Sequence, residues 1–344
     1  MNKVRLGKTG LMVSRVGFGG IPIQRLSTEE AINVVRGVIA MGVNFIDTAY
    51  NYGDSEEKIG LAIKGIPRDE LIIATKSSAP DKKTFLEHLD TSLKRLGTDY
   101  IDIHQHHNVS TLKNYEAIMA ENGAYEGMME AVRAGKVRFP AASSHSIDLA
   151  VKIIQDGKYM AIQAPFNFVD DKAAAKAIPL AKESDIGFIA MKPFGGGLLD
   201  DASTAIKYLM QFDNVVPDPG IEKLSEMEEI IRIIESGEQF NASDAETVDK
   251  MRAELGDHWC HKCDYCQPCP QNIRICVVLT LETFFKRMPI AHIVKTIGKL
   301  VENARNCTNC RVCMSRCPYN LNIPVLLKEK LALWDNYLTE NVSK

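Results

Sequence analysis

The stretch 43–76, VNFIDTAYNYGDSEEKIGLAIKGIPRDELIIATK, contains one full repeat of the pattern that decides the fold. An apolar run of strand length, Val43–Ile46, comes before the segment Ser55–Lys64, whose apolar residues recur at every third or fourth position. A second apolar run, Leu71–Thr75, follows. Because a spacing of three to four residues is typical of a helix buried on one face, the stretch predicts a strand, a helix and a second strand.

The same alternation extends over residues 1–240. The predicted strands are Arg15–Phe18, Val43–Ile46, Leu71–Thr75, Tyr100–Gln105, Val137–Ala142, Met160–Gln163, Gly187–Ala190 and Asn214–Val216. The predicted helices are Thr28–Met41, Ser55–Lys64, Lys82–Leu96, Gly123–Ala134, Asp148–Gln155, Lys172–Glu183, Asp201–Gln211 and Leu224–Glu235. Eight such units predict an α/β fold of the (β/α)8 TIM barrel type, whose parallel strands are buried on both faces. A doubly wound sheet is the alternative, but Gly17, Gly19 and Gly20 miss its glycine spacing.

Composition and charge narrow the classes of function. The 344 residues include 41 Lys and Arg against 44 Asp and Glu, so the chain lacks the basic field that attracts nucleic acid or anionic lipid. No stretch approaches the roughly eighteen apolar residues of a membrane span, and the N-terminus lacks the apolar core of a signal peptide. We therefore expect a cytoplasmic protein with no nucleic-acid or membrane partner.

The cysteines define a second domain. All nine lie between Cys260 and Cys317, which predicts a barrel over 1–240 and a separate domain over 241–344. A disulfide framework suits small secreted chains better than one with a large cysteine-free body. Eight cysteines form two runs, each followed by proline: Cys260, Cys263, Cys266 and Cys269, and then Cys307, Cys310, Cys313 and Cys317.

The spacing within the runs indicates iron and sulfur. The second run has the spacing of a bacterial ferredoxin, and the first is one residue shorter before its last cysteine. Because the fourth cysteine of each ferredoxin run binds the other cluster, we expect two [4Fe-4S] clusters with crossed ligands. One would use Cys260, Cys263, Cys266 and Cys317, and the other Cys307, Cys310, Cys313 and Cys269. Zinc is the alternative, since four-cysteine zinc sites also use paired cysteines.

Two features of the tail lie outside these runs. Cys276 fits neither of them and is interpreted as a buried structural thiol. Residues 277–304 and Ile323–Leu338 have helical periodicity, so the second domain is predicted to be a small, mostly helical ferredoxin-like unit.

Polar side chains follow three consecutive predicted strands. Asp47, Lys76 and His107 stand where these strands end, and Tyr52 lies five residues after Asp47. Active sites of barrels gather at this end. A neighbouring ammonium lowers the pKa of a phenol, so Lys76 would make Tyr52 a usable proton donor. Asp47 would hold the lysine and His107 would bind a carbonyl oxygen, which together predict reduction of a carbonyl by hydride.

Each of these residues has a plainer interpretation when taken alone. An isolated polar residue at a strand end is more often a solvated loop residue or a helix cap than a catalyst. The chemical hypothesis therefore rests on the four occurring together. His104 and His106 are interpreted as packing residues, because alternation along the strand turns both away from the side that His107 faces. A three-histidine zinc site is the less favoured alternative.

Residues 1–236 resemble the aldo-keto reductase family. The similarity is most specific in RLGKTGLMVSRVGFG at 5–19, FIDTAYNYGDSE at 45–56, IATK at 73–76 and GTDYIDIHQHH at 97–107. This resemblance implies a (β/α)8 barrel that binds NADPH or NADH without a Rossmann motif. It also implies a catalytic tetrad, which falls on Asp47, Tyr52, Lys76 and His107.

The resemblance also implies cofactor contacts in three segments. Ser143 and Ser144 stand where the family has Ser-Asn, and Gln163 matches the glutamine that holds the carboxamide with them. The loop AMKPFGGGLL at 190–199 resembles the one around the pyrophosphate, and it contributes Lys192, Gly195, Gly196 and Gly197. Lys192 replaces an aromatic residue of many members. Lys223 is the remaining cation near the 2′-phosphate position, where Glu226 departs from the family pattern.

The whole chain resembles the subgroup of this family with a C-terminal ferredoxin-type domain. A hydride carries two electrons, whereas a [4Fe-4S] cluster ordinarily passes one. Transfer between them needs a bridging group, and a flavin could serve because a barrel can bind one without a recognisable motif. We expect a carbonyl or alcohol oxidoreductase whose clusters connect the barrel to a one-electron carrier such as ferredoxin. One alternative is an electron-transfer protein with a vestigial tetrad. The other is an NAD(P)H carbonyl reductase with structural clusters.

Overall fold

The chain forms two compact units, Met1–Asp244 and Ala245–Lys344. The computed structural model describes residues 1–262, 265–317 and 319–342. The division falls four residues after the expected boundary at 240, inside helix α11 (Ala242–Leu255). Each unit has its own apolar core, which is what two separate domains require.

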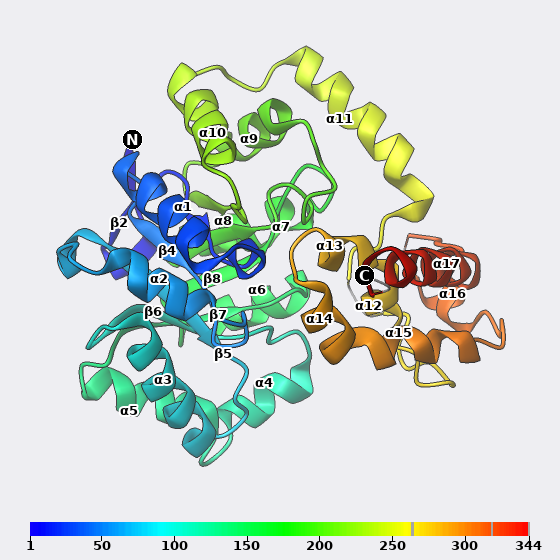
Figure 1. The fold of residues 1–344 in the computed structure, drawn as a ribbon, viewed down its shortest axis with the longest axis horizontal. Coiled ribbons are helices and arrows are strands. Elements are labelled where there is room, and N and C mark those ends of the chain that lie inside the picture. Colours follow the sequence, from blue (N-terminus) through cyan, green and yellow to red (C-terminus); the bar gives the residue numbers. More distant parts are fainter. Residues whose placement is uncertain (263–264, 318, 343–344) are drawn as a thin grey trace. The chain divides into compact units, whose positions relative to one another are not determined.

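The first unit contains a ring of parallel strands surrounded by helices (Figure 1). Consecutive strands are hydrogen-bonded neighbours throughout, as the predicted (β/α)8 barrel requires. In chain order the strands are β3 (Phe18–Gly19), β4 (Phe45–Asp47), β5 (Ile72–Ser77), β6 (Ile101–His106), β7 (Val137–Ser143), β8 (Ala161–Pro165), β9 (Gly187–Met191) and β10 (Val215–Asp218).

The barrel closes between its first and last strands. The amide of Gly17 donates to the carbonyl of Pro217 at 2.8 Å, and that of Gly19 donates to Pro219 at 2.8 Å. A Cβ on Gly19 would lie 2.7 Å from the Pro219 carbonyl oxygen, so this close approach requires glycine. Strand β3 starts later than the predicted Arg15–Phe18, because the amide of Arg15 bonds to Asn2 instead of to a barrel strand.

The helices of the first unit lie outside the strands, and seven of the eight predicted segments each contain one helix. The predicted segment Lys172–Glu183 contains two short helices, and α4 adds one that the periodicity did not predict. The helices are α1 (Thr28–Ala40), α2 (Ser55–Ile63), α3 (Lys82–Leu96), α4 (Leu112–Met119), α5 (Ala124–Arg133), α6 (Ile147–Gln155), α7 (Lys172–Ala175), α8 (Ala177–Glu183), α9 (Ala202–Met210) and α10 (Leu224–Ser236).

A hairpin that the sequence pattern did not predict precedes the barrel. Strands β1 (Lys3–Arg5) and β2 (Met12–Ser14) pair antiparallel, and the apolar side chains of Leu6, Leu11 and Val13 are buried. They form one cluster with residues of the barrel strands, including Phe45 and Ile103. The hairpin therefore covers apolar side chains of the barrel strands.

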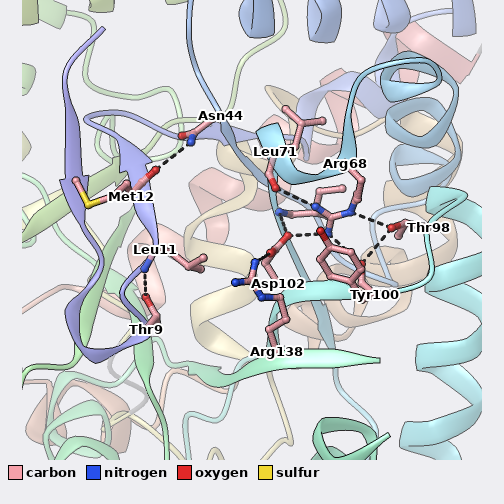
Figure 2. Close-up of polar contacts among 11 residues, drawn as sticks. Thr9, Leu11, Met12, Asn44, Arg68, Leu71, Thr98, Tyr100, Asp102 and Arg138 are labelled. Carbon is pink, nitrogen blue, oxygen red and sulfur yellow. Dashed lines mark hydrogen bonds and ion pairs between the residues drawn. The ribbon is translucent and has the colours of Figure 1, made fainter. Parts of the chain in front are cut away.

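A polar cluster lies where β5 and β6 begin (Figure 2). Asp102 is fully buried, and its carboxylate accepts hydrogen bonds from Arg68 at 2.6 Å, Arg138 at 2.6 Å and the amide of Ile73 at 3.0 Å. Arg68 also donates to the carbonyls of Leu71 and Tyr100. Two cations and an amide thus satisfy one buried acid and join the two strands.

The second unit is helical, as its periodicity predicted. Its helices after α11 are α12 (Ile275–Leu279), α13 (Leu281–Phe285), α14 (Ile290–Ile293), α15 (Lys299–Glu302), α16 (Val312–Arg316) and α17 (Ile323–Val342). Trp334 of α17 is buried in their core, and its indole N–H donates to Glu302 at 2.7 Å. Within the described part of the chain, no helix has both the length and the apolar character needed to span a membrane.

Candidate active site

Lys76 lies at the centre of a polar cluster at the carboxyl ends of the strands. It belongs to β5 and is 2% exposed. Its ammonium donates to the carboxylate of Asp47, which ends β4, and to the carbonyl of Thr48 at 2.7 Å. Parallel strands with register Asp47↔Ala74 bring these two side chains together, as the sequence predicted.

Tyr52 and His107 complete the predicted group of four. The ammonium of Lys76 lies 5.1 Å from the centre of the Tyr52 ring. The rings of Tyr52 and His107 meet edge to face with centroids 5.6 Å apart. His107 follows β6, and its amide is held by the carbonyl of Ser77 at 2.8 Å. All four side chains therefore converge at one end of the barrel.

The surroundings fix the charge states of two of these groups. Burial lowers the pKa of Lys76, but attraction to Asp47, and to Tyr52 and Asp218 in their ionised forms, outweighs burial and raises the pKa above its ordinary value. Lys76 is therefore an ammonium at neutral pH. Desolvation, followed by the charge on Lys76, lowers the pKa of His107 to about 3. Its ring is neutral at pH 7 and suited to hydrogen bonding.

A fifth ionisable group, Asp218, was missed by the sequence analysis. It ends β10, and its carboxylate accepts a hydrogen bond from Gln163 at 2.8 Å. The same amide nitrogen lies 3.4 Å from the carboxylate of Asp47. The predicted strand stopped at Val216, two residues short. The rule that found Asp47, an acid at the end of a buried strand, would have found Asp218 too.

The residues expected to hold the carboxamide are buried and hydrogen-bonded within the protein. The Ser143 hydroxyl accepts from the amide of Asn108 at 2.9 Å. The Ser144 hydroxyl donates to the carbonyl of Ser146 at 3.0 Å, and the Ser144 amide donates to the carbonyl of Gln163 at 2.9 Å. These contacts place Ser143, Ser144 and Gln163 on neighbouring strand ends, as the resemblance implies.

The glycine loop after β9 has an unusual backbone. Lys192, Gly195, Gly196 and Gly197 all have positive φ, from 58° to 90°. The ammonium of Lys192 lies 3.4 Å from Nδ1 of His145. Positive φ at three successive glycines permits a curve that a chain with side chains rarely adopts. The loop thus has the conformational freedom expected of one that surrounds a phosphate.

The segment at the start of α10 carries an acid, Glu226, beside Lys223, the cation expected near the 2′-phosphate position. The carboxylate of Glu226 accepts from the amides of Glu222 at 2.8 Å and Lys223 at 3.0 Å. A helix N-terminus attracts one negative group through such amides, and here Glu226 supplies it. The carboxylate of Glu226 would repel a 2′-phosphate bound beside Lys223.

The outer face of β6 carries two further histidines. His104 and His106 are fully buried, and their rings lie 4.8 Å and 5.4 Å from the ring of Phe85 on α3. Gln105 between them points the other way and donates to Asp47 at 3.3 Å. The prediction that His104 and His106 face away from the active site is confirmed.

Four cysteines line one cavity in the second unit. They are Cys269, Cys307, Cys310 and Cys313, joined in the lining by Arg311. Burial raises the pKa of Cys313, with Cys307 and Cys310 as additional causes, so these three sulfurs are near one another. The backbone has positive φ at Asn309 and Arg311, a conformation that turns amides toward an anion.

The other expected cysteine set is only partly described. Cys263 lies outside the described residues, so the grouping of Cys260, Cys263, Cys266 and Cys317 is untested. Among the described residues, no three Cys, His, Asp or Glu side chains form a group that could hold a metal ion. Cys276 is buried on α12, outside the cavity lining, which agrees with a structural thiol.

Comparisons with known proteins find relatives of the barrel. The Aldo/keto reductase family profile matches residues 15–232. An aldo-keto reductase of Bacillus subtilis is 31% identical over 242 residues, which cover 65% of this chain and 71% of that protein. The NADH-specific methylglyoxal reductase of Escherichia coli is 30% identical over 233 residues, which cover 59% and 71%.

Solved structures show the same fold. The holo form of an aldo-keto reductase from Bacillus halodurans has a TM-score of 0.62 and 24% identity, and the match covers 73% of this chain and 96% of that one. The profile match ends at residue 232, so it does not extend over the cysteine-rich unit. These matches over the barrel show that the chain is an oxidoreductase that belongs to the aldo/keto reductase family.

Proposed function

We propose that the barrel reduces a small carbonyl compound, with Tyr52 as the proton donor to the carbonyl oxygen. The observation that carries this proposal is the placement of Lys76, which is buried, ion-paired with Asp47 and 5.1 Å from the Tyr52 ring. A fixed ammonium stabilises the phenolate that forms when Tyr52 gives up its proton. His107, which is neutral, binds the carbonyl oxygen and directs it toward the tyrosine.

NADH is the reductant that this chain's residues favour, and it supplies hydride when bound. Ser143, Ser144 and Gln163 would hold its carboxamide, and the loop with Lys192, Gly195, Gly196 and Gly197 would surround its phosphates. The carboxylate of Glu226 beside Lys223 disfavours the extra phosphate of NADPH. One relative is named as an NADH-specific methylglyoxal reductase, which makes methylglyoxal a suitable first substrate.

The barrel proposal is tested by the oxidation of NADH in the presence of methylglyoxal. We expect Tyr52→Phe to lower kcat by about 10²- to 10⁴-fold, the usual contribution of a general acid. Tyr50→Phe is the matched control, because it removes a hydroxyl two residues away, from a ring stacked on His88. The proposal fails if both variants keep full turnover, and a faster rate with NADPH than with NADH would refute the cofactor preference.

We further propose that the second unit holds two [4Fe-4S] clusters. Support comes from the cavity lined by Cys269, Cys307, Cys310 and Cys313, the crossed set that ferredoxin spacing implies. Each thiolate of a cubane binds a different iron, so the four ligands of such a cluster need not converge on a single point as the ligands of one ion do. Cys260, Cys263, Cys266 and Cys317 would hold the other cluster. Clusters supply one-electron transfer, the chemistry of an external carrier such as ferredoxin.

Metal analysis of anaerobically purified protein tests this second proposal. We expect iron and sulfide, with roughly half of both lost in Cys313→Ser, which removes one of the four proposed ligands of one cluster. Cys276→Ser should keep the full iron content, because Cys276 lies outside the cavity lining. Zinc in place of iron would overturn the assignment, and flavin analysis of the same sample decides whether a flavin is bound.

Turnover separates the proposed coupling from its two alternatives. Reduction of the two clusters by NADH in the absence of any carbonyl compound, one electron to each, and their reoxidation by added oxidised ferredoxin would support exchange of electrons with a one-electron carrier. Unchanged turnover after removal of iron would instead identify a carbonyl reductase with structural clusters. An electron-transfer protein with a vestigial tetrad is the remaining outcome, and it predicts that dithionite reduces the clusters while the natural chain and Tyr52→Phe alike fail to oxidise NADH with methylglyoxal.

A further inference from the structure

Asp218 lies beside the group of four at the carboxyl ends of the strands, although it belongs to the last strand of the barrel. Its side chain is 6% exposed. The side-chain amide nitrogen of Gln163 on β8 donates hydrogen bonds to Asp218 at 2.8 Å and to Asp47 at 3.4 Å. A Cβ on Gly17 would lie 3.1 Å from Oδ1 of Asp218, so this oxygen faces the start of β3. One amide thus joins two buried carboxyl groups.

The charges around Asp218 do not balance if every acid is ionised. The titratable groups that act on it are Asp47 on β4 and Lys76 on β5, and the ammonium of Lys76 in turn lies 5.1 Å from the centre of the Tyr52 ring. Gln163 contributes only a neutral amide. Two carboxylates would therefore have one ammonium, and Lys76 is already bound to Asp47. Two adjacent carboxylates in a buried site are costly, so one of them keeps its proton.

The hydrogen bonds identify Asp218 as the acid that keeps the proton. Among the described residues, Oδ1 of Asp218 is a buried oxygen with no hydrogen-bond partner, whereas Asp47 accepts from Lys76. Burial first, then the charge on Asp47 and the hydrogen bond with it, raise the pKa of Asp218 well above its usual value. Lys76 and Gln163 act in the opposite direction and do not cancel that effect.

We propose that Asp218 is a positioning residue whose carboxyl group shares one proton with Asp47, which leaves a single negative charge opposite Lys76. This inference rests on the proposed role of Tyr52 as proton donor. When Asp218 loses its proton at high pH, a second negative charge appears beside Lys76 and Tyr52. That charge opposes ionisation of the phenol, so proton donation to the carbonyl becomes slower.

The test compares the pH dependence of kcat for NADH and methylglyoxal in the whole protein and in Asp218→Asn. Asparagine has the same shape and cannot ionise. We expect the alkaline decline of kcat to move upward by about one pH unit in the variant. Asp213→Asn, an exposed acid before β10, should leave the profile unchanged. Identical profiles for Asp218→Asn and the natural chain would overturn the inference.

Infrared spectroscopy tests the shared proton without turnover. At pH 7 we expect the C=O band of a buried protonated carboxyl group, which is lost in Asp218→Asn and kept in Asp213→Asn. We also expect Asp47→Asn to lose it, because Asp218 then becomes the partner of Lys76 and ionises; this second variant decides the question if Asp218→Asn does not fold. Persistence of the band in either variant, or its absence from the natural chain, would overturn the inference.

The two proposals fail in different ways. Full turnover in Tyr52→Phe would refute proton donation by the tyrosine, yet it would leave the infrared result on Asp218 intact. Conversely, an unchanged pH profile in Asp218→Asn together with inactive Tyr52→Phe would refute only the role of Asp218.

Discussion

Buried acids at the two ends of the barrel differ in how many cations and hydrogen-bond donors balance their negative charge. Where β5 and β6 begin, Asp102 alone receives two guanidinium groups and a backbone amide. Where the strands end, Asp47 and Asp218 share one ammonium, that of Lys76, and the neutral amides of two glutamines, and an oxygen of Asp218 has no partner among the described residues. A satisfied acid stabilises a fold, whereas an incompletely compensated group has a shifted pKa and is suited to proton transfer.

The difference also agrees with how barrels divide their tasks. Chemistry occurs at the carboxyl ends of the strands, and residues at the amino ends contribute to stability. Strand β6 connects the two ends, because Asp102 is near its start and His107 follows its end. Substitutions at the two ends should therefore affect different measurements.

The largest effect is expected for Lys76→Met, which should lower kcat by about 10²- to 10⁴-fold because Tyr52 loses its ammonium neighbour. The measurement is NADH oxidation with methylglyoxal. Lys58→Met is a matched control, since Lys58 is also a buried lysine but bonds to the carbonyls of Ile23 and Leu26, outside the active site. Equal losses of kcat in both variants would show that the effect comes from the loss of any buried lysine and not from the position of Lys76.

The next effect is on stability at the opposite end. Asp102→Asn should lower the free energy of unfolding by about 3 kcal/mol, the low end of the range for a broken buried pair. The low end applies because Arg68 and Arg138 are 21% and 46% exposed and can reach water. Denaturant unfolding measures this loss, and kcat of the folded variant should be unchanged. A stable but inactive Asp102→Asn protein would contradict the division of tasks.

A smaller effect is expected on the pH dependence of stability, through the buried histidines His104 and His106 of β6. Burial lowers the pKa of His104 and of His106 to about 3 in the folded chain, against an ordinary 6.5. The unfolded chain therefore binds more protons between these values, and stability should fall as the pH drops from 6.5 toward 3.

His106→Phe isolates one of these histidines. It keeps a ring against Phe85 and Tyr159 and removes the titrating group, so stability should decrease less between pH 7 and pH 5 than in the natural chain. Denaturation at the two pH values gives the comparison, with exposed His258→Gln as the control. An unchanged acid sensitivity would mean that other groups cause it.

The smallest effect is expected at the surface. Asp213 and Lys182 form an ion pair at 2.8 Å with both side chains mostly exposed. Asp213→Asn should change the free energy of unfolding by about 0–1 kcal/mol, because water and salt screen such pairs. A thermal unfolding scan at two salt concentrations measures it. A loss as large as that of Asp102→Asn would show that burial does not explain the difference between these acids.

Much of the active site followed from local pattern. Strand-length apolar runs predicted the barrel, and the rule that chemistry follows strand ends located Asp47, Lys76 and His107. These residues lie together because neighbouring parallel strands place their ends side by side, so order along the chain becomes proximity in space. The helical tail and the two cysteine runs were equally visible in local spacing.

The sequence by itself determined the number of strand and helix units, the identities of the four converging side chains and the spacing of the cysteines. Only the tertiary structure decided that Asp218, 171 positions after Asp47, lies beyond β3 from it and bonds to the same side-chain amide of Gln163. Closure pairs β3 with β10, and that contact depends on the curvature of all eight strands together. Local periodicity does not encode such a long-range contact, because it is produced by the complete ring rather than by any one segment.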